Sequence, residues 1–272
     1  MKGILAFLFI ILLAAAQESC SVPVWNTGDT WVWQVSEPGI GKSREVFLSE
    51  EKEINLLTSV VQGKEFIEGA ECYHDYETYD GHPESEYHSY YLISCPPTEH
   101  HGIQYNTQTK KPVMKSTINP GNYIVQFPLY VGQTWNEDYT FVEWTYQEET
   151  DTWTQTSEIV VEIEANVKGI ESVTVPPGTF EAYKIEVMYY TFKMVKSVIW
   201  YSPEVKNSIK GEAYVIEDKI PHLYYEYELV EYHLVQPFLL EMGLGAAASI
   251  CVAAGAYYIC YMKKKKTKEL IT

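Results

Sequence analysis

Alternation of apolar and polar side chains with a period of two is the feature that most constrains how this chain can fold. Almost every stretch from about residue 24 to residue 235 alternates in this way and is rich in Val, Ile, Thr, Tyr and Trp. These residue types suit a pleated, half-buried surface. No window of a dozen residues in this part has the 3.6-residue period of an amphipathic helix. The pattern therefore predicts an all-β fold.

Turn residues divide this part of the chain into strands. In residues 223–235 the large apolar side chains alternate with acidic ones, so one face is expected to meet a core and the other to meet water. The residues on the apolar face are Leu223, Tyr225, Tyr227 and Leu229. Other clear strands are residues 30–35, 54–61, 157–167 and 182–191, and pairs such as Asp80-Gly81 and Pro177-Gly178 mark turns.

Residues 1–16 have the pattern of a secretory signal peptide. One early cation, Lys2, precedes an uncharged stretch that ends in three alanines directly before Gln17. Such a stretch is typical of a leader with an Ala-x-Ala cleavage site. The alternative is a lipoprotein signal with Cys20 as the acylated residue, but Gln17 and Glu18 stand where that signal needs Leu and a small residue.

A second apolar segment predicts a transmembrane helix over residues 238–262. The 21 residues from Met242 to Met262 carry no formal charge, and at 1.5 Å per residue they cover roughly the 30 Å hydrocarbon core of a bilayer. Four lysines follow at once and open a basic tail, residues 263–272. The positive-inside rule places this tail in the cytoplasm and residues 17–237 outside it. We therefore expect a single-pass membrane protein with an extracytoplasmic β domain.

One face of the predicted helix carries small residues at four-residue spacing. Such a face lets two helix backbones approach closely and could form a homodimer contact, although small residues are common in spanning helices in any case. The residues are Gly243, Ala247, Cys251 and Gly255.

The predicted extracytoplasmic part is strongly acidic. Residues 17–237 contain 14 Lys and Arg against 35 Asp and Glu, a net charge of −21. A field of this sign repels nucleic acid and would attract cations or basic partners, whereas the simpler interpretation is a solvated surface that keeps the domain soluble. Nucleic acid is therefore excluded as a partner.

Three cysteines, Cys20, Cys72 and Cys95, fall in the predicted extracytoplasmic part, where disulfides can persist. If residues 70–79 and 86–95 pair around a turn at Pro83 and Glu84, Cys72 and Cys95 lie opposite each other. We therefore expect a Cys72–Cys95 disulfide, with Cys20 free or bonded to another chain.

The sequence shows a faint internal duplication. The run Gly28-Asp-Thr-Trp31 recurs as Gly132-Gln-Thr-Trp135, and later matches follow in the same order. They are Ala70-Glu-Cys-Tyr73 with Phe180-Glu-Ala-Tyr183, and Tyr90-Tyr91 with Trp200-Tyr201. Matches this short have low specificity, but they suggest two similar β-meanders, residues 24–118 and 119–235, that join in one curved sheet or form two domains.

Four motifs in the second half resemble a known group of proteins. They are Val173-Thr-Val-Pro-Pro-Gly-Thr-Phe-Glu-Ala-Tyr-Lys-Ile185, Trp200-Tyr-Ser-Pro-Glu-Val205, Tyr227-Glu-Leu-Val-Glu-Tyr232 and Phe127-Pro-Leu-Tyr-Val-Gly-Gln-Thr-Trp135. They are similar to motifs of an uncharacterised group of secreted archaeal and bacterial β-rich proteins, well over residues 125–235 and loosely over residues 24–105. The chain departs from the group at Lys206-Asn207, because the group has Gly directly after Val.

The resemblance implies a large, curved antiparallel sheet similar to the half-barrels of bacterial lipoprotein carriers, whose concave face holds acyl chains. It brings no established catalytic residues, so none is carried over to this chain.

Five of the seven histidines lie within residues 72–101, among several carboxylates. Converging imidazoles bind zinc, copper or nickel, but no pair here has the spacing of a known zinc motif, and exposed hairpin histidines are the simpler interpretation. These weak metal candidates are His74, His82, His88, His100 and His101.

No sequence motif indicates catalysis. A Gly-x-Ser-x-Gly elbow and a Gly-rich phosphate loop are both missing from the sequence, and carboxylate pairs carry no information without geometry. We expect a protein that is not an enzyme and has no cofactor.

The aromatic residues are more suggestive, since 23 of the 272 residues are Tyr and several Trp lie in predicted strands. Rings that line a concave sheet can bind acyl chains or sugars, although rings also simply build sheet cores. The candidate ligand-binding residues are Trp33, Trp135, Tyr183, Trp200, Tyr225 and Tyr227.

Three hypotheses about function follow. The first is a membrane-anchored domain that binds a lipid, an acyl chain or a surface protein without catalysis. The second is a structural component of the cell envelope that self-associates through its helix. The third is a metal-handling domain centred on the histidines.

Overall fold

The computed structural model describes residues 19–37, 53–94, 98–121, 124–191, 195–217 and 220–236. The chain divides into two units, Met1–Leu234 and Val235–Thr272, and all the strands belong to the first. Within the described residues, no helix is long and apolar enough to cross a membrane. The predicted leader (residues 1–16), transmembrane helix (238–262) and basic tail (263–272) lie outside the described residues, as do Gly243, Ala247, Cys251 and Gly255.

The first unit is all-β, as predicted, and its described residues contain strands and turns only. Each long strand pairs antiparallel with its neighbour in the chain order. The first series is β2 (Thr30–Glu37), β3 (Glu53–Ile67), β4 (Ala70–Tyr79), β5 (Ser85–Leu92), β6 (Glu99–Asn106) and β7 (Pro112–Asn119). The second is β9 (Thr134–Gln147), β10 (Thr152–Val175), β11 (Gly178–Tyr189), β12 (Val195–Ser202), β13 (Asn207–Glu217) and β14 (Ile220–His233). The short strands β1 (Ser19–Cys20) and β8 (Leu129–Tyr130) pair with each other.

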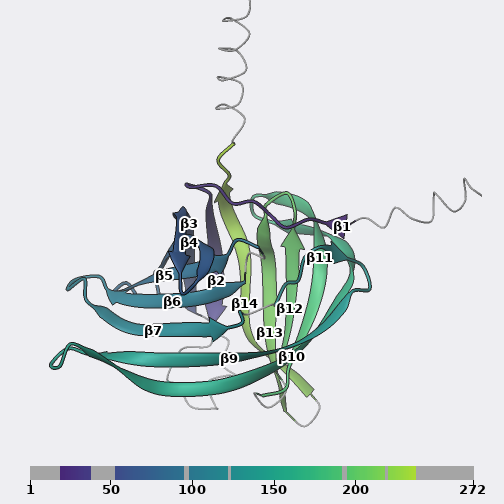
Figure 1. Ribbon diagram of the computed structural model, residues 1–272. Coiled ribbons are helices and arrows are strands. Elements are labelled where there is room, and N and C mark those ends of the chain that lie inside the picture. Colours follow the sequence, from purple (N-terminus) through teal and green to yellow (C-terminus); the bar gives the residue numbers. More distant parts are fainter. Residues whose placement is uncertain are drawn as a thin grey trace, which may run out of the picture. The chain divides into compact units, whose positions relative to one another are not determined.

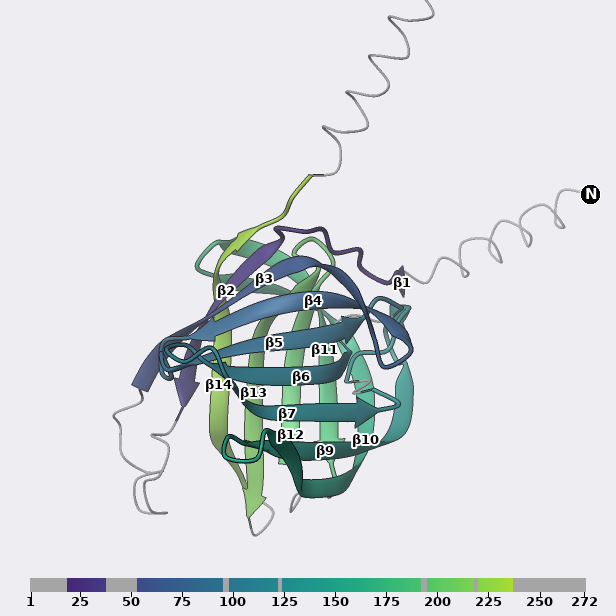
Figure 2. The same cartoon turned by 60° about the vertical axis from the view of Figure 1, so that its left-hand side comes forward.

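The sheet closes into a barrel of the twelve long strands (Figure 1 and Figure 2). The last strand, β14, pairs with the first, β2, and β7 pairs with β9 to join the two series. The expectation of an open half-barrel is therefore wrong, although the predicted curved antiparallel sheet is present. Closure gives every long strand two partners, so no edge of the large sheet is left unpaired.

The two series begin with the same backbone arrangement. Gly28 has φ 91° and Gly132 has φ 84°, in the left-handed region that favours glycine. The Gly28 N–H donates to the Val61 carbonyl at 2.7 Å, and the Gly132 N–H donates to the Val167 carbonyl at 2.9 Å. Register shifts follow in both partner strands, between Val61 and Gly63 and between Val167 and Gly169.

The later matches also fall at corresponding positions. Tyr73 pairs with Tyr91, and Tyr183 pairs with Tyr201. A register shift follows each time, between Tyr90 and Tyr91 and between Trp200 and Tyr201. The strands of both series are thus related position by position, and they join in one sheet.

Three indole groups fasten the N-terminal segment to the turn between β12 and β13. The Nε1–H of Trp31 donates to the Val205 carbonyl at 2.9 Å, and that of Trp25 donates to the Lys206 carbonyl at 3.0 Å. The Nε1–H of Trp33 donates to the Ser208 carbonyl at 2.9 Å. Because these bonds are made inside the protein, the indoles bury their apolar area without leaving a polar group unpaired.

One local prediction differs from the structure, and one departure from the resembling group is explained by it. A register shift between Ala213 and Tyr214 breaks the alternation of β14, so Leu223 pairs with Tyr214 and is 41% exposed instead of sharing the inner face with Tyr225. The left-handed residue of the β12–β13 turn is Lys206, with φ 61°, at the position where the resembling group has Gly.

We predict that Trp31→Phe destabilises the barrel by about 2–4 kcal/mol. The substitution leaves the Val205 carbonyl without its indole donor and opens a cavity around a side chain that is 0% exposed. Guanidinium unfolding of the full chain, followed by fluorescence of the other tryptophans, measures the loss. The control Trp144→Phe changes a half-buried residue and should cost less than about 1 kcal/mol; equal losses would contradict the anchoring role of Trp31.

Candidate functional site

The barrel interior keeps a cavity of about 260 Å³ where the first series of strands meets the end of the second. Strands β2 to β6 form one part of its wall, and β13 and β14 form the other. A second cavity of about 280 Å³ shares Leu57, Glu77 and Tyr225 with it, so the two are neighbouring parts of one interior space. The first cavity is lined by Trp25, Trp33, Leu57, Ser59, Asp75, Glu77, Tyr91, Glu99, Ile124, Asn207, Ser208, Tyr225 and Tyr227.

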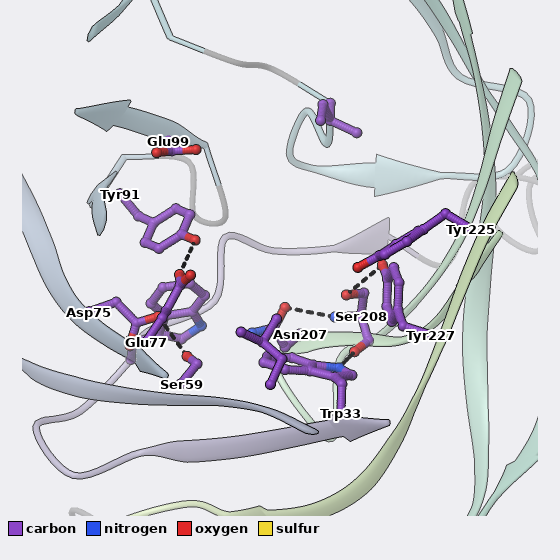
Figure 3. A pocket seen from close by; sticks show the side chains of 13 residues that line it. Trp33, Ser59, Asp75, Glu77, Tyr91, Glu99, Asn207, Ser208, Tyr225 and Tyr227 are labelled. Carbon is purple, nitrogen blue, oxygen red and sulfur yellow. Dashed lines mark hydrogen bonds between the residues drawn. The ribbon is translucent and has the colours of Figure 1, made fainter. Parts of the chain in front are cut away.

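Carboxyl groups form one wall of the first cavity (Figure 3). Asp75 is 2% exposed, and its Oδ2 accepts a hydrogen bond from the Ser59 hydroxyl at 2.6 Å. Its Oδ1 is buried with no N–H or hydroxyl donor among the described residues, and the Asp75 side chain is hydrogen-bonded to Glu77 when one of the two carboxyl groups is protonated. The Tyr91 hydroxyl donates to Glu77 Oε1 at 2.8 Å. Glu77 and Glu99 are half-buried by area, and the surface that they keep faces the cavity.

Burial makes these carboxyl groups hard to ionise. Loss of hydration, followed by the charge of Glu77, raises the pKa of Asp75 well above its usual value. Burial also raises the pKa of Glu77, against hydrogen bonds from Tyr91 and Ser89 that lower it. Burial, followed by the charge of Glu77, raises the pKa of Glu99 to about 8. Burial therefore favours the protonated form of all three groups, and Glu99 keeps its proton at neutral pH unless a positive charge comes close.

Aromatic and hydroxyl groups form the opposite wall (Figure 3). The Tyr227 hydroxyl donates to Ser208 Oγ at 3.0 Å, and Trp33 bonds the carbonyl of the same serine. Tyr227 lies over Gly211, its partner on β13, where a Cβ atom would come within 2.2 Å of the ring. Tyr225 lies next to Tyr227, with their ring centroids 5.9 Å apart. Because Gly211 has no Cβ atom, it leaves room for the Tyr227 ring on the wall opposite the acids.

The second half of the barrel has apolar residues where the first half has this acidic wall. Val61 pairs with Asp75, and its counterpart Val167 pairs with Ile185. Two residues along, Glu77 corresponds to Val187, and its partner Ser59 corresponds to Ala165. Ile185, Val187 and Ala165 are all 0% exposed. The same backbone arrangement therefore packs without carboxyl groups.

Such a site can bind in two ways. Protonated carboxyl groups can donate hydrogen bonds to a neutral acceptor, and ionised ones can pair with a cation. Titratable groups with strongly raised pKa values in a cavity are frequent at functional sites, although structural networks show them as well.

The structure brings three of the six candidate ligand-binding aromatics together. Trp33, Tyr225 and Tyr227 line the first cavity. Trp135 and Tyr183 instead pack into the apolar core of the second half. Trp200 pairs with Lys184 on the outward face, and its Nε1–H donates to Glu171 Oε2 at 2.9 Å. The alternation alone could not place Trp200, because a register shift follows it.

Of the five candidate histidines, His74 and His88 are in direct contact with each other. His74 Nε2 lies 2.8 Å from His88 Nδ1, and His74 Nδ1 lies 2.7 Å from Glu65 Oε1. His101 contacts the Tyr90 ring that stacks on His74, whereas His82 packs against Tyr79. Both ring nitrogens of His100 are buried with no partner among the described residues. No group of three His, Cys, Asp or Glu that could hold a metal ion occurs in the described part of the chain.

The cysteine register differs from the prediction. Cys72 is buried and pairs with Leu92, not with Cys95, because the β4–β5 turn lies closer to β4 than expected. Cys95 lies outside the described residues, so the disulfide stays a prediction. Cys20 is buried in β1, and burial raises the pKa of its thiol to about 11.

Sequence reasoning missed Asp75, Glu77 and Glu99, because an acidic residue in an alternating strand normally marks the solvent face. The internal duplication held a usable signal. When the two matching segments are aligned at Tyr73 and Tyr183, Asp75 aligns with Ile185 and Glu77 aligns with Val187. Because Ile and Val at these positions are expected to face the core, the alignment indicates that the two acids face inward.

Comparison with known proteins does not assign this chain to a family. No protein-family model matches the sequence, and no curated protein matches it. A solved structure from Bacteroides fragilis, described as an exported protein with a YmcC-like fold, is 13% identical with a TM-score of 0.45, over 79% of this chain and 100% of that chain. A Parabacteroides distasonis structure described as a lipoprotein is 14% identical with a TM-score of 0.41, over 80% and 100%.

The hypothetical lipoprotein YmcC from Escherichia coli is 8% identical with a TM-score of 0.30, over 82% of this chain and 96% of that chain. All three TM-scores are below 0.5, and we base no conclusion on these similarities. The similarity to lipoprotein carriers stays a prediction.

We predict that the free energy of unfolding falls as pH rises from 5 to 8. The folded chain keeps a proton on Glu99 up to about pH 8, whereas the unfolded chain loses it near the ordinary value of 4.5. The folded state thus binds more protons in this window, so stability decreases with pH. In Glu99→Gln the decrease should be smaller, by on the order of 2 kcal/mol at pH 8.

Urea unfolding of the full chain at pH 5, 6.5 and 8 measures this difference. The control is Glu181→Gln, an exposed residue of β11, which should follow the unsubstituted protein at every pH. Parallel pH curves for Glu99→Gln and the unsubstituted protein would show that Glu99 does not hold its proton in the folded state.

Proposed function

We propose that this protein is a non-catalytic binding protein that takes a small ligand into the first half of its barrel. The observation that carries the proposal is the lined cavity of about 260 Å³, continued by a second of about 280 Å³. A wide barrel leaves internal space that side chains must fill or a ligand can occupy. In the second half aliphatic and aromatic side chains fill it, whereas beside the polar side chains of β3, β4 and β6 it stays open.

The two walls define what the ligand must look like. Trp33, Tyr225 and Tyr227 favour an apolar body, while Asp75 and Glu77 opposite them favour a polar group. A purely hydrocarbon chain matches only the aromatic wall, because it would cover buried carboxyl groups without bonding to them. We therefore narrow the hypothesis of a lipid or acyl ligand to a small molecule with one apolar and one polar end.

The predicted leader and transmembrane helix indicate where in the cell the ligand would be bound. They place the barrel outside the cytoplasm, held at the membrane by residues 238–262. A binding domain so placed would capture its ligand at the cell surface and keep it near the membrane.

We predict that filling the interior removes a bound molecule. Leu57 lines both cavities, and Leu57→Trp should occupy the space between them. The matched control is Leu56→Trp, one residue away, because Leu56 is 40% exposed on the other face of β3. Native mass spectrometry of the full chain, purified from its own cells, should show an added small mass in the unsubstituted protein and in Leu56→Trp, and none in Leu57→Trp.

Thermal unfolding of both variants checks that the barrel remains folded. If the unsubstituted protein carries no small molecule, or if Leu57→Trp keeps it, interior binding is wrong. The mass of the released molecule before and after long incubation with fresh protein tests the absence of catalysis, because an enzyme would change it.

A further inference from the structure

We propose that the ligand of this cavity is an organic cation, an ammonium group on an apolar body, which the carboxyl groups of Asp75, Glu77 and Glu99 recognise. The proposal rests on the proposed function and adds the chemical class of the ligand. The ammonium group would face the acidic wall, and the apolar body would lie against Trp33, Tyr225 and Tyr227.

The acidic wall lacks a countercharge. Three carboxyl groups line one cavity, and the described residues that line it include no lysine or arginine. Elsewhere in the barrel the acids of the outer face have such partners: Glu186 pairs with Lys196 at 2.8 Å, and Glu86 pairs with Lys110 at 2.9 Å. Buried carboxyl groups without a countercharge favour their protonated form, so a positive charge that enters the cavity would be the first partner there for their ionised form.

Asp75 has one carboxyl oxygen that no N–H or hydroxyl donor reaches. Its Oδ2 accepts from the Ser59 hydroxyl, while Oδ1 is buried at the cavity wall and has no such donor among the described residues. The hydrogen bond between the side chains of Asp75 and Glu77 needs a proton on one of the two carboxyl groups. An ammonium group has N–H donors and a positive charge, so it can take the place of that proton.

The second half of the barrel shows that the fold does not need acids at these positions. Ile185, Val187 and Ala165 take the places of Asp75, Glu77 and Ser59 there and are fully buried. The buried acids lower the stability of the folded barrel, and the fold does not need them. Residues of this kind are expected where a function requires them.

The opposite wall suits a cation with an apolar body. Aromatic faces attract ammonium groups through the ring quadrupole, most strongly for Trp and Tyr. The barrel already uses this contact outside the cavity, where the ammonium groups of Lys184 and Lys210 lie 5.3 Å and 5.0 Å from the centre of the Trp200 ring. A bare metal ion fits less well, because the described acids form no group of three that could hold one.

The pH dependence follows from all the groups that face the cavity. Asp75, Glu77 and Glu99 face it from β4 and β6, and the hydroxyls of Ser59 and Tyr91 lie among them. From β14, Tyr225 and Tyr227 face it, and His82 lines the second cavity. Burial raises the pKa of Tyr91 and that of Tyr227, so these two hydroxyls keep their protons in the tested range. The raised pKa of Glu99, about 8, sets the expected change: a cation should displace the Glu99 proton, and its affinity should rise with pH up to about 8.

The test compares two probes of the same shape, 2-phenylethylammonium and 2-phenylethanol. Calorimetric titration of the full chain in lipid nanodiscs, corrected with empty nanodiscs, gives both affinities at pH 6 and pH 8. At pH 8 we expect the ammonium probe to bind at least tenfold more tightly than the alcohol. At pH 6 the affinity for the ammonium probe should be at least fivefold lower than at pH 8. Titration in buffers of different ionisation heat should show proton release on binding of the ammonium probe.

Substitutions assign the selectivity to the acidic wall. Glu99→Gln and Glu77→Gln should each lower the ratio of ammonium to alcohol affinity at least fivefold, whereas the exposed control Glu181→Gln should keep it. The double variant Asp75→Ile, Glu77→Val installs the residues of the second half. It should stay folded, with an unchanged or higher unfolding temperature, and should lose the preference for the cation.

The outcomes separate the two proposals. Equal binding of both probes, removed by Leu57→Trp, would keep the binding function and overturn the cation. A cation preference that survives in the double variant would place recognition elsewhere and also overturn it. Absence of binding by both probes, in a protein that carries no small molecule from its own cells, would overturn both proposals.

Discussion

The pairing of β14 with β2 is the constraint on which the rest of this structure depends. Glu226 to His233 bond along Ser36 to Thr30, so the last strand of the meander completes a closed sheet. Closure fixes the interior, since every inward side chain must then fit one shared space. The indole of Trp33 strengthens the same closure, because it lies on β2 and donates to the Ser208 carbonyl on β13, the strand beyond β14. In this closed space the second half packs with apolar side chains, while cavities remain beside the acids of the first half.

The acidic wall is the part of that interior that works against folding. Asp75, Glu77 and Glu99 lose hydration in the barrel, which raises the pKa of each carboxyl group, that of Glu99 to about 8. In the second half the positions that correspond to Asp75 and Glu77 are occupied by Ile185 and Val187, which are 0% exposed. Apolar residues therefore pack well at these positions. Two halves with one backbone pattern and opposite interiors support the proposal that the acidic positions serve binding and not packing.

The sequence was sufficient for the strands but not for their closure. The alternation predicts β2, β3, β10, β11 and β14, because a half-buried strand has a period of two wherever it lies. An open half-barrel and a closed barrel have the same alternation, so the pairing of β14 with β2 could not be read from it. Register was equally hidden: a bulge moves Leu223 outward, and a shift of a few residues sets Cys72 opposite Leu92. The acids were missed because their alternation is that of a solvent-facing strand.

The same duplication gives the histidines a simpler explanation than metal binding. On the outward face of the second half, Trp200 pairs with Lys184 on one side and Lys210 on the other, and both ammonium groups lie over its ring. At the corresponding places in the first half, Tyr90 pairs with His74 and His101, whose rings contact it with centroids 4.9 Å and 5.7 Å away. An aromatic ring between two basic side chains is thus a feature of both halves. His74 and His101 therefore have counterparts that cannot serve as imidazole ligands, which favours a packing role for them on the outer face and leaves the acidic cavity as the feature peculiar to the first half.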